Sequence, residues 1–107
     1  MNQPTFIYNP QDEKHTVWVV EDNEEFGRQL AGLLNLSDKF ACEHVFTACE
    51  PALELLQNDE LPDLILMDIG LPGMSGIEGV REIKTLAPSV EVVILTVFED
   101  SEKVFQA

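Results

Sequence analysis

Two apolar runs that end in acidic residues constrain the fold of this chain more than any other sequence feature. Residues 16–20 read TVWVV and lead directly into Glu21 and Asp22. Residues 64–67 read LILM and lead directly into Asp68. Short runs that are apolar on both faces are typical of buried strands in a parallel sheet. The pattern therefore predicts two central strands that carry carboxylates at their C-terminal ends.

Helical patterns alternate with these strands. Apolar side chains recur at the spacing of one helix face over residues 24–35. They are Phe26, Leu30, Leu33 and Leu34. Pro51, a residue favoured in a first helical turn, predicts a second helix that Pro62 closes. Ser75 and Glu78 form a capping-box pattern that opens a third helix.

The remaining segments complete an alternating order of strands and helices. Residues 40–48 and 90–95 are strand candidates, and residues 99–107 begin a fourth helical pattern. This order predicts an α/β domain with a parallel sheet, right-handed crossovers and helices on both faces. Such doubly wound sheets bind ligands outside the carboxyl ends of their strands. The polar residues expected there are Glu21, Asp22, Asp68 and Thr96.

Length and composition fit one soluble domain. We divide the 107 residues into an N-terminal arm, residues 1–15, and a folded domain, residues 16–107. Twenty Asp and Glu against six Lys and Arg give a net charge of −14, which disfavours direct binding to nucleic acid or anionic membranes. With two cysteines, no signal-peptide pattern and no membrane-length apolar run, the chain is expected in the cytoplasm.

Three carboxylates gathered at one sheet edge need a compensating cation. Left unpaired, Glu21, Asp22 and Asp68 would repel one another and raise at least one pKa. No basic residue adjoins them in the sequence, so a divalent cation bound through oxygen is the simplest partner. Mg²⁺ fits best, because it uses one or two carboxylates and keeps several waters. For any one of these acids alone, a helix cap or a solvated loop position is the commoner role.

Three segments resemble the motifs of response-regulator receiver domains of two-component signalling. They are residues 19–23 (VVEDN), 66–76 (LMDIGLPGMSG) and 93–96 (VILT). The middle segment is the most specific, because it sets a nucleophile, a turn and a helix cap at fixed offsets. The resemblance covers about residues 16–107 and implies a flavodoxin-like doubly wound parallel sheet of strand order 2-1-3-4-5.

The resemblance also implies a role for each acidic residue. Asp68 would accept a phosphoryl group from a sensor histidine kinase, and Thr96 would contact the phosphoryl oxygens. Asp22, Asp68 and the backbone carbonyl of Gly70 would hold Mg²⁺, with Glu21 supporting the ion through water. Phosphoryl transfer needs mainly an in-line nucleophile and positive charge on the equatorial oxygens. The domain would then be a signalling phosphoacceptor rather than an enzyme.

The sequence departs from the receiver pattern at its C-terminal end. The pattern implies a fifth strand with a lysine and an aromatic residue, then a fifth helix, and the sequence ends at Ala107 before all of them. Lys103 lies in the fourth helical pattern and does not match that lysine. We therefore expect the strand at residues 90–95 to be an open edge. The chain would be unstable alone, or would form a homodimer through this strand and the fourth helix.

An output domain would also be missing. Residues 96–105 resemble receivers that precede a LuxR-class DNA-binding module, which implies control of transcription by a longer parent protein. Two alternatives remain. A pseudo-receiver would keep the fold as a protein-binding module without phosphorylation. A magnesium-dependent phosphatase of the haloacid dehalogenase type would also form an aspartyl phosphate, although its Asp-x-Asp signature is missing here.

Overall fold

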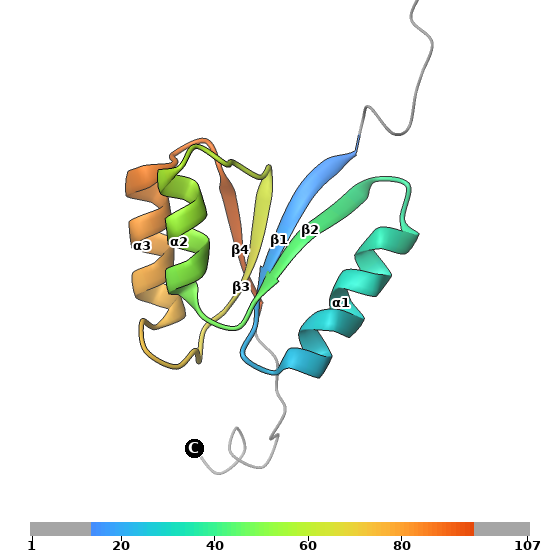
Figure 1. Ribbon diagram of the computed structural model, residues 1–107, viewed down its shortest axis with the longest axis horizontal. Helices are drawn as coiled ribbons and strands as arrows, with labels where there is room; N and C mark the ends of the chain where they lie inside the picture. Colours follow the sequence, from blue (N-terminus) through green and yellow to red (C-terminus); the bar gives the residue numbers. More distant parts are fainter. Residues whose placement is uncertain (1–13, 96–107) are drawn as a thin grey trace, which may run out of the picture.

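Four parallel strands form one sheet, in the order β2-β1-β3-β4. The computed structural model describes residues 14–95. Its strands are β1 (His15–Val20), β2 (Phe40–Phe46), β3 (Leu64–Asp68) and β4 (Glu91–Leu95). Its helices are α1 (Glu24–Leu36), α2 (Cys49–Gln57) and α3 (Gly76–Leu86). Helix α1 lies on one face of the sheet and helices α2 and α3 lie on the other, which confirms the doubly wound α/β prediction (Figure 1).

The register of the central strands decides where the acidic residues meet. Val20 of β1 pairs with Met67 of β3, so that the residues that follow them, Glu21 and Asp68, lie at the same level of the sheet. The ladder between β1 and β2 also continues past β1, because the Glu21 amide donates a 2.8 Å hydrogen bond to the Phe46 carbonyl. The carboxyl ends of β1 and β3 therefore share one edge.

The main core lies between the sheet and the α2–α3 face. Four side chains are almost wholly buried there: Trp18, Ile65, Met67 and Ile83. The two helices approach closely at Gly79, where a Cβ atom would lie 2.5 Å from the Cys49 sulfur. Cys49 is thus a buried packing residue with a free thiol.

Two elements end earlier than predicted, for local reasons. The second helix ends at Gln57 rather than at Pro62, because Asn58 caps it and Asp59 takes a left-handed φ of 65°. The second strand ends at Phe46 rather than at residue 48, because Ala48 already stands in the N-cap position of α2.

One of the four apolar side chains on the predicted face of the first helix is exposed. Leu33 is 65% exposed, although it shares the apolar spacing of Leu30 and Leu34. Helix α1 packs mainly on β1 and β2, and that contact covers a narrower stripe than the sequence pattern predicts.

Several predictions fall outside the described residues. The fourth helix over residues 99–107, Thr96 and Lys103 all lie there, as does nearly all of the predicted arm, residues 1–15. The fifth strand of the 2-1-3-4-5 order has no counterpart between residues 14 and 95, where β4 is an edge strand paired with β3. No helix in this part of the chain is both long and apolar enough to cross a membrane.

Candidate metal centre

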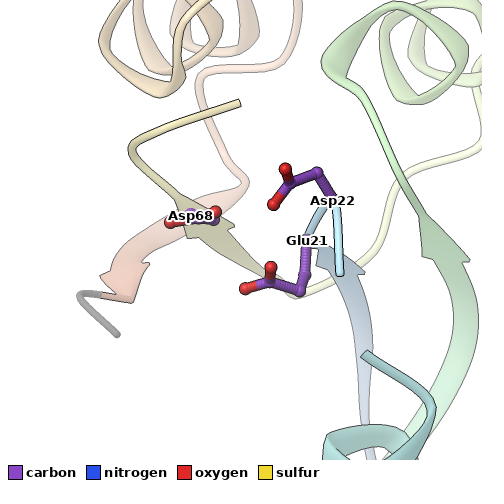
Figure 2. A group of neighbouring side chains, drawn as sticks. All are labelled: Glu21, Asp22 and Asp68. Carbon is purple, nitrogen blue, oxygen red and sulfur yellow. The ribbon is translucent and has the colours of Figure 1, made fainter. Parts of the chain in front are cut away.

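Three carboxylates meet at the carboxyl edge of the sheet, as predicted (Figure 2). Glu21 and Asp22 follow β1, and Asp68 is the last residue of β3. One carboxylate oxygen from each side chain lies within 4.8 Å of the others. At this spacing, one cation can contact an oxygen of each of the three residues, either directly or through a bound water.

Glu21 is the buried member of the group. Its exposed fraction is 0%, whereas Asp22 is exposed and Asp68 is half-buried. Oε2 of Glu21 accepts a 2.9 Å hydrogen bond from the Asn23 amide. Oε1 is buried and has no hydrogen-bond partner among residues 14–95. A buried carboxylate oxygen without a partner is costly, so this atom fits a site that receives a cation or a cation-bound water.

The environment of Glu21 opposes its ionisation. Burial raises the pKa of Glu21 to about 7, and the charges of Asp68 and Asp22 act in the same direction. The hydrogen bond from the Asn23 amide acts the other way and lowers this pKa. A divalent cation would remove the repulsion and favour the charged form. The donor set, three carboxylates and no nitrogen or sulfur, suits a hard cation such as Mg²⁺.

The turn after β1 is fixed by a helix cap. Asn23 is the N-cap of α1, and its Oδ1 accepts a 3.0 Å hydrogen bond from the Phe26 amide. The same residue donates its own amide to Glu21. Asn23 therefore accepts a hydrogen bond from an amide in the first turn of α1 and also orients the buried carboxylate. Sequence analysis missed this double role.

The loop after β3 is fixed at both ends. At its start, Oδ1 of Asp68 accepts a 3.4 Å contact from the Gly70 amide. At its end, Ser75 and Glu78 form the predicted capping box, with each side chain accepting from the other residue's amide. Space beside Gly70 is open, since a Cβ atom there would meet nothing within 4 Å. The role of the Gly70 carbonyl as an ion ligand stays a prediction.

Gly76 is a second residue that sequence analysis missed. A Cβ atom at this position would lie 2.8 Å from the Ile69 Cα and still closer to the Asp68 carbonyl oxygen. The Gly76 amide also donates a 3.0 Å hydrogen bond to the Ile69 carbonyl. A glycine at the first helical position, directly after the capping serine, was the available signal. Its absent side chain lets α3 begin directly against the end of β3.

The fold and the site together define a class: an α/β domain with a parallel sheet and an acidic centre where two neighbouring strands end. The family model of the response regulator receiver domain matches residues 17–107. The chain therefore belongs to the response regulator receiver domain family of two-component signalling.

Relatives of this chain include proteins with different outputs. It is 36% identical over 84 residues to the transcriptional regulatory protein CreB of Escherichia coli, a match covering 78% of this chain and 35% of that protein. It is 32% identical over 89 residues to a protein-glutamate methylesterase/protein-glutamine glutaminase of Paramagnetospirillum magneticum, covering 83% of this chain and 25% of that protein. The chain thus spans about a third or less of either relative.

Solved structures give the same fold. The signal receiver domain of the response regulator NarL from Mycobacterium tuberculosis matches with a TM-score of 0.72 and 26% identity. That match covers 88% of this chain and 75% of the NarL chain. It confirms the receiver fold expected from the sequence.

Proposed function

We propose that Asp68 accepts a phosphoryl group from a sensor histidine kinase, in a magnesium site held by Asp22, Asp68 and the backbone carbonyl of Gly70. The observation that carries the proposal is the meeting of three carboxylates around a buried Glu21 oxygen that has no partner within the described part of the chain. Glu21 would support the ion through water. Membership of the receiver domain family supports the choice of Asp68 as the phosphoryl acceptor.

The chemistry assigned to Asp68 follows from its surroundings. Oδ1 accepts a 3.4 Å hydrogen bond from the Gly70 amide, and we assign the attack on phosphorus to the other oxygen, Oδ2. As Oδ2 forms its bond to phosphorus, the bond from phosphorus to the donor histidine nitrogen breaks, and that nitrogen keeps the electron pair. Bound Mg²⁺ would neutralise charge on the carboxylates and on the equatorial phosphoryl oxygens. Thr96 would donate its hydroxyl to one of those oxygens, a role that rests on the sequence resemblance alone.

The test is phosphorylation by a small donor, read by intact mass. With acetyl phosphate and Mg²⁺, the wild-type chain should gain one phosphoryl group, and EDTA should prevent the gain. Asp68→Asn should abolish it, because an amide is not a nucleophile for phosphorus. Asp59→Asn is the matched control, since it removes one negative charge at the far end of α2, where the left-handed backbone also suits asparagine.

Other outcomes would overturn the proposal. A gain that persists in Asp68→Asn would exclude Asp68 as the acceptor. Catalytic turnover of the donor would favour the phosphatase alternative. A folded wild-type chain and a folded parent protein that both stay unmodified would favour the pseudo-receiver.

The curated relatives are longer than this chain, so we propose an output for a longer parent protein. We propose a cytoplasmic regulator of transcription, supported by the relative CreB, which is named a transcriptional regulatory protein. The methylesterase relative is named as an enzyme, so the output must be tested directly. The full parent protein should bind promoter DNA more tightly after phosphorylation, and DNA binding that is absent in both states would refute this proposal.

A further inference from the structure

Two neighbouring residues in the first turn of α2 hold the C-terminal half of the loop between β3 and α3. Oε2 of Glu50 accepts a 3.3 Å hydrogen bond from the Met74 amide. The sulfur of Cys49 lies 3.9 Å from the Ser75 carbonyl oxygen. Gly73 has a φ of 70°, and a Cβ atom there would lie 3.1 Å from the same Glu50 oxygen. The loop therefore rests directly on α2 at residues 73–75.

The other half of this loop contacts the proposed phosphoryl acceptor. The Gly70 amide contacts Oδ1 of Asp68, and Leu71 is buried in the core with 8% exposure. The Gly76 amide closes the loop by its hydrogen bond to the Ile69 carbonyl. Because the loop is closed between Ile69 and Gly76 and only residues 71–73 separate Met74 from Gly70, the position of Met74 limits where Gly70 can lie. The Met74 contact thus bears on the orientation of Asp68.

We propose that Glu50 is a positioning residue of this site, acting as the hydrogen-bond acceptor that fixes the loop carrying Gly70. The inference rests on the proposed function, because the property that Glu50 would improve is magnesium binding at Asp68 and Gly70. Glu50 needs no contact with the ion. Its charge also lies in the first turn of α2, where it favours the helix electrostatically, so the positioning role must be separated from a simple effect on helix stability.

Three single substitutions separate these effects. Glu50→Ala removes the acceptor, Glu50→Gln keeps an acceptor oxygen without the charge, and Glu54→Ala removes the same charge one helical turn further along α2 on an exposed position. Mg²⁺ affinity is measured by isothermal titration calorimetry on the 107-residue chain. We expect Glu50→Ala to weaken binding roughly tenfold, by analogy with the loss of an outer-shell partner. Glu50→Gln should stay within about twofold of wild type, and Glu54→Ala should not change affinity.

A second measurement makes the result independent of the metal. In EDTA, amide hydrogen exchange at Met74 should be faster in Glu50→Ala than in wild type and close to wild type in Glu50→Gln, while thermal melts show that all variants are folded. Unchanged Met74 exchange in Glu50→Ala would overturn the positioning role, whether or not Mg²⁺ binds. Normal Mg²⁺ affinity in Glu50→Ala would overturn it too, and so would a Glu50→Gln variant as weak as Glu50→Ala. A wild-type chain that binds no Mg²⁺ would instead overturn the proposed function.

Discussion

At the scale of single residues, the buried carboxylate of Glu21 dominates the behaviour of the site. Three acids occupy a space where one cation would fit, and the one that water does not reach is the hardest to ionise. Asn23 supplies its one hydrogen bond, and the remaining oxygen has none among the described residues. The metal-free domain therefore holds an electrostatic conflict that cation binding would relieve.

This conflict predicts a pH dependence of stability in EDTA. The folded pKa of Glu21, about 7, lies above its ordinary value of 4.5, so between these values the folded state holds the proton more tightly than the unfolded state. The free energy of unfolding should fall as pH rises through this range, by at most about 3 kcal/mol. Glu21→Gln cannot ionise and should remove this part of the slope. Urea denaturation at pH 5 and pH 8 measures the effect.

The matched control is Glu24→Gln, an exposed position in the first turn of α1, which should keep the wild-type slope. Equal slopes for Glu21→Gln and wild type would contradict the prediction. Millimolar Mg²⁺ should restore stability at pH 8 in the wild-type chain more than in Glu21→Gln.

At the scale of elements, close backbone approaches decide how the helices meet the sheet and one another. Gly79 lets α3 lie against Cys49 of α2, and Gly76 lets α3 begin against the end of β3. The capping box of Ser75 and Glu78 sets the point at which α3 starts. These contacts fix the loop that carries the proposed phosphoryl acceptor.

Two glycine-to-alanine substitutions should therefore change the free energy of unfolding in opposite directions. Gly79→Ala forces a methyl group to within 2.5 Å of the Cys49 sulfur and should lower the free energy of unfolding by about 1–3 kcal/mol. Gly32→Ala lies in α1 with nothing within 4 Å and should raise it by roughly 0.5–1 kcal/mol, because alanine favours the helix. Denaturant titration compares the two, and adding Cys49→Ala to Gly79→Ala should relieve the clash. Destabilisation by Gly32→Ala alone, or no rescue in the double variant, would count against this packing.

At the scale of the whole molecule, β4 exposes a strand edge together with apolar side chains. It is an edge strand within residues 14–95, and Val93 and Ile94 are 47% and 39% exposed. Unpaired backbone groups beside apolar side chains favour pairing with another chain. The homodimer through β4 and the fourth helix thus stays a prediction, with this edge as its structural support.

Sedimentation velocity over a range of concentrations tests this association. The 107-residue chain should self-associate or unfold without a cooperative transition, and Val93→Lys should reduce the association, because a charged edge resists pairing. Leu61→Lys, at an exposed apolar position just before β3, serves as the control and should leave association unchanged. A monodisperse monomer with a cooperative thermal transition would refute the prediction.

Local patterns were sufficient to predict much of this protein. The apolar runs before Glu21 and Asp68 predicted two buried strands and placed the acids at their ends, and the serine–glutamate pair predicted the capping box of α3. These features depend on neighbouring residues, so periodicity and spacing reveal them. The rule that parallel strands share a carboxyl edge then predicted the acidic centre.

Tertiary structure decided what depends on residues far apart in the chain. The pairing of Val20 with Met67 sets how close the acids lie, and burial by the folded chain sets the pKa of Glu21. The contact of Glu50 with Met74 joins residues 24 positions apart, and no local pattern marks it. Such features arise only when separate elements pack, because distances between side chains are set by the packing and not by the order of residues.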